Sequence, residues 1–86
     1  MHELPFFNQA FAAVMRSHRE AARKTQLEIA FSIGGSESYV RRLEGAKQTP
    51  TSSTLILVAR AMGLSPDIFL KEVLQQMSYL EASKKV

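Results

Sequence analysis

Two consecutive glycines, Gly34 and Gly35, divide residues 25–44 into two short stretches with helical spacing. A hydroxyl residue precedes each stretch, and the side-chain oxygens of Thr25 and Ser36 are suited to cap the free amides of a first helical turn. The glycines between the stretches permit the positive φ that ends one helix and redirects the chain. The segment therefore predicts two short helices joined by a tight turn.

These two predicted helices differ in the surfaces that they present. Apolar residues at helical spacing define an inward face, which comprises Leu27, Ile29, Ala30, Ile33, Val40 and Leu43. With Val40 inward, a rotation of about 100° per residue places Ser38, Arg41 and Arg42 on the outer side of the second helix. Two short helices with a basic, exposed second helix are typical of a helix-turn-helix, whose second helix fits the major groove of DNA.

Three further helices are predicted around this pair, and no strand pattern competes with them. The first predicted helix covers about residues 8–23, the fourth about residues 52–62 and the fifth about residues 66–79. Proline, glycine or hydroxyl residues mark the starts and ends of the last two helices. The chain is thus predicted to be all-α, with residues 1–86 forming one domain, a core over about residues 8–80 and mobile ends.

Composition excludes several other classes of protein. The 86 residues include no cysteine, so a disulfide framework or a thiolate metal site is excluded. His2 and His18 lie far apart without ligand spacing, so we expect no metal and no cofactor, and His18 is expected to pack on the inner flank of its helix. No apolar run reaches the roughly 18 residues of a membrane span and no signal-peptide pattern is present, which favours a cytoplasmic protein. The net charge of +3 is compatible with nucleic-acid binding.

A series of residues over about residues 11–70 matches a known pattern in order and spacing. The series comprises Arg19, Gln26, Glu28-Ile29-Ala30, Gly34, Ser38 to Glu44, Lys47, Pro50-Thr51 and Ala59 to Asp67. In this order the chain resembles the Cro/C1-type, or XRE-like, helix-turn-helix family of phage and bacterial regulators. The resemblance implies a compact, lambda-repressor-like bundle of five helices that binds DNA, usually as a dimer.

The sequence departs from the family pattern in the turns that flank the two short helices. Arg23 stands where glycine is common and Lys24 stands where an apolar residue is common. After the second short helix the chain has Gly45-Ala46-Lys47, where the family often has its glycine directly before the lysine. A left-handed backbone at Arg23 would carry strain, because its side chain disfavours positive φ.

The outer face of the second short helix is expected to contact DNA bases. Arginine can bond two acceptors on guanine, glutamate can accept from cytosine and serine is adaptable. We favour Arg42 as a base-reading residue, and Arg41 is equally suited to a base or a phosphate. An acid in a first helical turn is also stabilising by itself, so both interpretations of Glu37 stay open. The expected base contacts are Glu37, Ser38, Arg41 and Arg42.

A second group of residues is expected to hold the DNA phosphates. The resemblance assigns Gln26 a phosphate contact and a bracing role for the recognition helix, and the start of a helix suits an anion. Tyr39 can reach a phosphate with its hydroxyl or pack against the preceding helix, and the two roles are compatible. The polar loop after the recognition helix leads into another helix start, which is typical of backbone contacts. Its expected phosphate contacts are Lys47, Gln48, Thr49 and Ser52.

Two further contacts are expected within and between chains. The resemblance implies an ion pair between Arg19 and Glu44 that ties the first helix to the end of the recognition helix. The fifth helix has an apolar face that is too wide for one buried seam, which favours a homodimer. The alternative is that this helix folds back over Phe6 and Phe7. The expected interface residues are Leu57, Leu70, Leu74 and Met77.

The predicted function is sequence-specific transcriptional regulation, most commonly repression. The chain would bind a palindromic DNA site as a homodimer, with the third helix in the major groove. Two alternatives stay open: an antitoxin that also binds a toxin protein, and a controller protein of a restriction–modification system. No residue set supports catalysis, and no membrane partner is expected.

Overall fold

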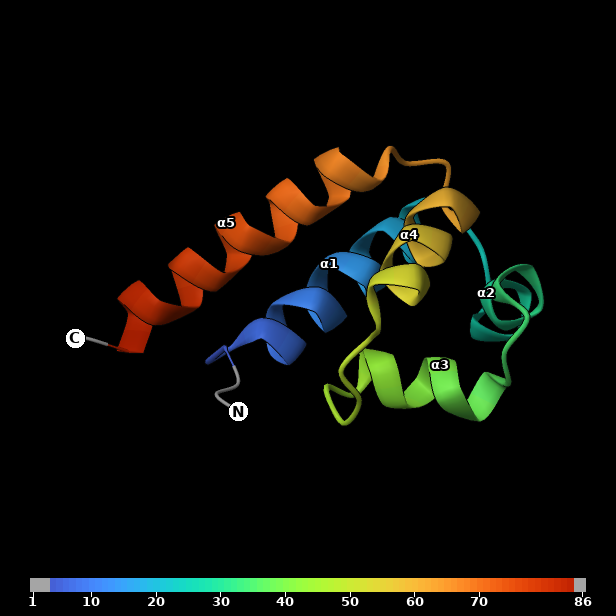
Figure 1. Ribbon diagram of the computed structural model, residues 1–86, viewed down its shortest axis with the longest axis horizontal. Helices are drawn as coiled ribbons and strands as arrows, with labels where there is room; N and C mark the ends of the chain where they lie inside the picture. The colour runs from blue at the N-terminus through green and yellow to red at the C-terminus, as the bar shows by residue number, and fades with distance from the viewer. Residues whose placement is uncertain (1–3, 85–86) are drawn as a thin grey trace.

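The computed structural model describes residues 4–84, in which five helices and no strand are present. Figure 1 shows α5 along one edge of the molecule and α3 along the opposite edge, with α1 and α4 between them. The predicted all-α bundle of five helices is confirmed. In chain order the helices are α1 (Phe7–Ala21), α2 (Gln26–Ile33), α3 (Glu37–Glu44), α4 (Ser52–Ala61) and α5 (Pro66–Lys84).

Local sequence signals set the starts of α2, α3 and α4. The Thr25 hydroxyl accepts from the amide of Glu28 at 3.1 Å, and the Glu28 carboxylate accepts from the amide of Thr25 at 2.8 Å. This reciprocal pair satisfies two amides that lack a partner inside the helix. Ser36 and Thr51 cap α3 and α4 in the predicted way. Gly34 has a φ of 71°, which ends α2 and redirects the chain into α3.

Two non-glycine residues adopt the left-handed conformation at the turns that depart from the family pattern. Arg23 has a φ of 57° and Ala46 has a φ of 58°. For an L residue this conformation costs about 1–2 kcal/mol, because Cβ approaches the following carbonyl oxygen. The chain therefore keeps turns that glycine would form without strain, and the rest of the fold compensates for the cost.

The core lies where α1 packs against α5 on one side and against α3 on the other. The rings of Phe11 and Phe69 meet edge to face at 5.6 Å, which joins α1 directly to α5. Full burial of side chains of this size contributes about 1.5–3 kcal/mol each relative to exposure. The largest fully buried side chains are Phe11, Met15, Ile29, Val40, Leu43, Val58, Phe69 and Val73.

Three expectations about helix limits and burial are wrong. Leu27 is 60% exposed rather than inward, because α2 buries Ile29 and Ala30 and turns Leu27 and Phe31 to the other side. The first helix ends at Ala21, two residues before its expected end. The fifth helix continues to residue 84, past its expected end at residue 79, and it includes residues 82–84 of the expected mobile tail. The remaining parts of the expected mobile ends, residues 1–3 and 85–86, lie outside the described residues.

Within residues 4–84 no single helix is both long and apolar enough to cross a membrane. The helices α4 and α5 reach that length and hydropathy only when they are taken together, and the chain bends by 106° between them. Each helix packs one apolar face into the core of the bundle, with Val58 of α4 and Phe69 of α5 fully buried.

Candidate nucleic-acid interface

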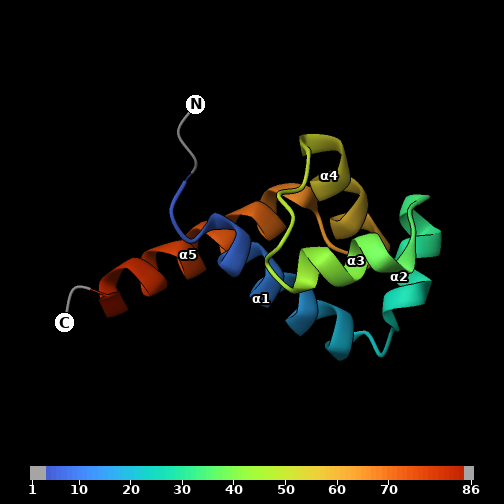
Figure 2. The same ribbon diagram turned by 90° about the horizontal axis from the view of Figure 1, so that it is seen from below.

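The outer face of α3 is polar and basic, and it lies at the surface of the molecule (Figure 2). Its four predicted base-contacting residues, Glu37, Ser38, Arg41 and Arg42, are all exposed. The Arg42 Nη1 donates to the Ser38 hydroxyl at 3.2 Å, and Arg41 Nη2 lies 3.3 Å from a carboxylate oxygen of Glu37. Exposed pairs of this kind contribute at most about 1 kcal/mol, so these arginines can exchange their partners for a base or a phosphate at little cost.

Tyr39 lies at the flank of this face, between the turn after α2 and the start of α4. Its ring is half-buried and packs beside Gly35, and its hydroxyl donates to the Thr54 hydroxyl of α4 at 3.4 Å. The Arg42 guanidinium lies 5.8 Å from the centre of the ring. The ring therefore packs inside the motif as one interpretation expected, and its contact with a phosphate stays a prediction.

The loop between α3 and α4 supplies the remaining polar residues of the predicted interface. Lys47 and Ser52 are exposed, whereas Gln48 is half-buried. The Thr49 hydroxyl donates to Oδ1 of Asn8 at 3.0 Å, which tethers the loop to the first turn of α1. The structure thus brings these residues to one side of α3, beside the N-terminus of α4 (Figure 2).

Glu44, the last residue of α3, joins three helices through a fully buried carboxylate. Arg19 of α1 donates from Nε to Oε2 at 2.6 Å and from Nη2 to Oε1 at 2.9 Å, so the predicted pair is present. Gln26 of α2 donates to Oε1 at 3.1 Å, and Arg16 of α1 donates to the same oxygen at 3.3 Å. Burial raises the pKa of Glu44, but the hydrogen bonds from Arg19, Gln26 and Arg16 outweigh it and leave the pKa below the ordinary value.

The Glu44 carboxylate fixes the position of the end of α3 against α1 and α2. Gln26, the first residue of α2, connects the end of α3 to the start of α2, as its predicted bracing role requires. Arg16 was not found from the sequence, because nothing local links it to a residue 28 positions away. The phosphate contact of Gln26 stays a prediction.

The contacts of Lys24 account for a charged residue at a position where the family commonly has an apolar one. Its ammonium group donates to the carbonyl oxygen of Ala61 at 2.7 Å, at the end of α4. Its own carbonyl oxygen accepts from Nη1 of Arg19 at 2.9 Å. A cation at the carboxyl end of a helix is favourable, because the last carbonyl oxygens have no partner inside the helix. A polar contact thus replaces the apolar packing that is common at this position.

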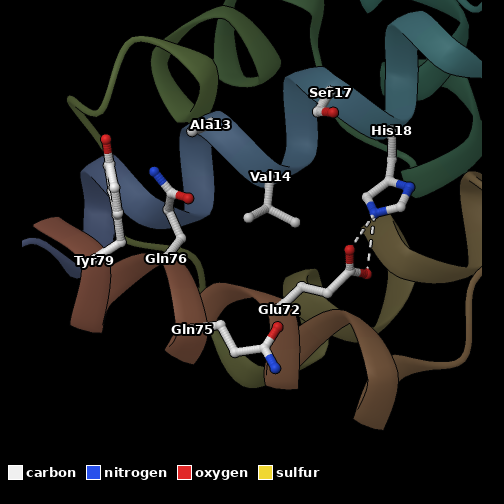
Figure 3. Close-up of a pocket in the computed structure, with 8 residues that line it drawn as sticks. All are labelled: Ala13, Val14, Ser17, His18, Glu72, Gln75, Gln76 and Tyr79. Atoms are coloured by element: carbon white, nitrogen blue, oxygen red, sulfur yellow. Dashed lines mark hydrogen bonds and ion pairs between the residues drawn. The ribbon is translucent and has the colours of Figure 1, made fainter.

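A second polar cluster lies between α1 and α5, on the side of α1 that faces away from Arg16. The His18 Nε2 lies 3.1 and 3.0 Å from the two carboxylate oxygens of Glu72 (Figure 3), rather than only packing as expected. The pair borders an open groove of about 390 Å³. Within residues 4–84 no group of three or more histidine or acidic side chains is placed to hold a metal ion, and His2 lies outside that range. The other lining residues are Ala13, Val14, Ser17, Gln75, Gln76 and Tyr79.

The expected dimer residues divide into an exposed set and one buried residue. Leu57, Leu70 and Leu74 are 40%, 37% and 48% exposed. Met77 is 8% exposed and belongs to the core, because it continues the four-residue spacing of the buried stripe from Val73. The expectation that Met77 lies on the exposed face is therefore wrong.

The fifth helix partly covers the segment Phe6-Phe7, which was the alternative to a dimer interface on this helix. The Lys84 ammonium group lies 5.4 Å from the centre of the Phe6 ring, so the end of α5 reaches the start of α1. Phe7 packs against the core and stacks on Phe11 at 6.2 Å. These contacts cover part of the N-terminal aromatic pair, and they leave Leu70 and Leu74 exposed.

The chain resembles proteins of known class in sequence and in structure. A family profile described as a helix-turn-helix domain matches residues 10–68. No curated protein matches the sequence. Two crystal structures of the clp gene regulator ClgR from Corynebacterium glutamicum share the fold. The first has a TM-score of 0.86 and 28% identity, over 94% of this chain and 86% of that chain. The second has a TM-score of 0.77 and 30% identity, over 86% of this chain and 96% of that chain.

Proposed function

The chain belongs to the helix-turn-helix domain family, in its Cro/C1-like class, and we propose that it represses transcription by binding a specific palindromic DNA site as a homodimer. The observation that carries the proposal is the exposed polar and basic face of α3, whose end is anchored by the buried carboxylate of Glu44. Repression is the proposed mode, because a protein bound over a promoter excludes RNA polymerase without any further contact. The proposed activity is binding and not catalysis.

In the proposed complex α3 lies in the major groove. Its first turn reaches deepest, so Glu37 and Ser38 face base edges together with Arg42. Arg42 reads a guanine through its two parallel donors, and Arg41 holds either a base or a phosphate. The exposure of all four side chains supports these roles.

The proposed phosphate contacts flank α3 on two sides. Gln26 and the start of α2 hold one backbone, with Tyr39 as a further contact. The loop after α3 and the start of α4 hold the other. The exposure of Lys47, Thr49 and Ser52 supports this arrangement, and Gln48 is half-buried.

The proposed dimer uses the exposed apolar residues of α4 and α5. Leu57, Leu70 and Leu74 leave apolar surface uncovered in one chain, and a second copy is the occupant that two-fold symmetry favours. Two recognition helices related by such an axis read half-sites about 34–36 Å apart, which makes the site palindromic. ClgR is described as a gene regulator, which supports the same class of function here. We expect the protein to act in the cytoplasm, beside the DNA that it regulates.

The test is DNA binding as a function of salt concentration. We expect tight binding to the DNA upstream of its own gene at low salt and a steep loss of affinity as salt rises, because each phosphate contact releases condensed counterions. Random-sequence DNA of the same length is the control and should bind more weakly. A folded protein that shows no preference for any upstream sequence at low salt would refute the proposal.

A further inference from the structure

Arg16 carries a positive charge that the buried ion pair does not need. Arg19 already donates to both carboxylate oxygens of Glu44, so one arginine is enough to neutralise that acid. Arg16 adds a third hydrogen bond to Oε1 through its Nε alone. The two arginines and Glu44 together carry one net positive charge, and Glu20 lies one helical turn after Arg16 on the same helix.

The exposed part of Arg16 is the part that could bind a ligand. A guanidinium group carries five N–H donors, and Nε supplies only one of them. Among residues 4–84 the Arg16 side chain makes no second hydrogen bond, and 52% of it is exposed. Because Nε is held by a fully buried carboxylate, the orientation of the group is constrained while its terminal nitrogens stay free.

Arg16 also lies beside the start of α2. Its Nε and the Gln26 side-chain amide donate to the same oxygen of Glu44, at 3.3 and 3.1 Å. Thr25 already caps the amide of Glu28, and the amides of Gln26 and Leu27 before it also have no partner inside the helix, an arrangement that favours an anion. Figure 2 shows α1 on one side of α3, and α4 with its preceding loop on the other. A positive group at this position adds to the attraction for an anion on the α1 side.

We infer that Arg16 contacts a DNA phosphate, on the backbone that borders the α1 side of α3. Glu44 holds the Nε of Arg16 and the amide of Gln26, so that both side chains present donors to the same stretch of backbone. Arg16 would thus act as a sequence-independent contact, whereas the outer face of α3 reads bases. This inference rests on the proposed DNA-binding function and adds to it a residue that none of the motifs assigns.

The experiment measures binding of the full chain to a fluorescently labelled, random-sequence DNA duplex at several salt concentrations. Replacement Arg16→Gln should reduce the slope of log affinity against log salt by about 0.9 for each protomer bound, the value for one phosphate contact on B-form DNA. Replacement Arg60→Gln is the matched control. It removes the same charge from an exposed position at the far end of α4, and it should leave the slope unchanged. Replacement Arg16→Lys keeps the charge and should restore most of the slope.

Two further results separate this role from a structural one. Thermal unfolding of Arg16→Gln should stay close to that of the parent, because Arg19 alone bonds both oxygens of Glu44. If Arg16→Gln does not fold, Arg16→Met is measured in its place, because methionine keeps the apolar stem of the side chain and removes the charge. If Arg16→Gln shows the same salt slope as the parent protein, this inference is wrong and the proposed function still stands. A parent protein that does not bind duplex DNA at low salt overturns the proposed function and this inference together.

Discussion

Arg19 and Glu44 form a two-pronged ion pair between α1 and the last residue of α3, with bonds of 2.6 and 2.9 Å. The Arg19 side chain is 14% exposed and the Glu44 side chain is fully buried. Loss of one partner therefore leaves a poorly solvated charge with too few partners: without Arg19, only Arg16 and Gln26 donate to Glu44, and both donate to Oε1. We expect Arg19→Met and Glu44→Gln each to reduce the free energy of unfolding by about 3–5 kcal/mol, measured by denaturant unfolding.

An exposed glutamate provides the control for that measurement. Replacement Glu81→Gln removes the same charge from the outer surface of α5 and should change the free energy of unfolding by less than about 0.5 kcal/mol. The double variant should lose less than the two single losses added together, because both residues belong to one network. Single losses within experimental error would show that the pair does not stabilise the fold.

The same carboxylate predicts how stability depends on pH. The pKa of folded Glu44 lies below the ordinary glutamate value, so between the two values the unfolded chain binds more protons than the folded protein. The stabilisation is therefore complete above the unfolded-state pKa of about 4.3 and is lost as pH falls through the folded-state pKa. Unfolding of parent and Glu44→Gln from neutral to acidic pH should show a stability difference that narrows in acid. Parallel pH profiles would contradict this assignment, since both proteins share every other carboxyl group.

Replacement of Arg41 and replacement of Arg42 should affect DNA binding in different ways. Arg42→Ala should cost about 1–3 kcal/mol on the preferred site and relax the preference at one base pair. If Arg41 holds a phosphate, Arg41→Ala should weaken binding to all sequences alike. Binding of each variant to a library of single-base operator variants distinguishes the two outcomes. Full retention of the parent preference by Arg42→Ala would mean that Glu37, Ser38 or DNA shape provides the specificity.

The burial difference between Leu74 and Met77 separates dimer formation from folding. A Leu70→Glu, Leu74→Glu double variant should stay folded and sediment as a monomer, because it charges only exposed positions. Met77→Ala should instead lower the free energy of unfolding by about 2–5 kcal/mol through a core cavity, with the dimer retained where the protein is folded. A folded double variant that sediments entirely as a dimer would place the interface elsewhere.

Features that depend on neighbouring residues could be predicted from the sequence. The caps at Thr25 and Ser36 and the turn at Gly34 involve residues within four positions of one another, so the helix-turn-helix was located correctly. The left-handed backbone at Arg23 was expected, because glycine is common at that position in the family, whereas the left-handed backbone at Ala46 was not predicted.

Features that depend on distant packing could not be predicted in this way. The short helix α2 is apolar over much of its surface, so periodicity alone did not separate buried Ile29 from exposed Leu27. The same difficulty placed Met77 on the wrong side of α5. The family resemblance supplied Arg19 as a partner of Glu44, but Arg16 lies 28 positions from Glu44 and Glu72 lies 54 positions from His18, and no local pattern identifies these two contacts.

The separation in sequence between contacting residues also sets an order of assembly. The contact between Gln26 and Glu44 closes a loop of 18 positions, whereas the contact between His18 and Glu72 closes one of 54. Because the entropy of loop closure grows with the logarithm of length, the second closure costs about 1 kcal/mol more. The first three helices should therefore assemble before α5 docks, and native-state opening should begin at α5. A nascent chain would then acquire its recognition helix before it can meet a second copy of itself.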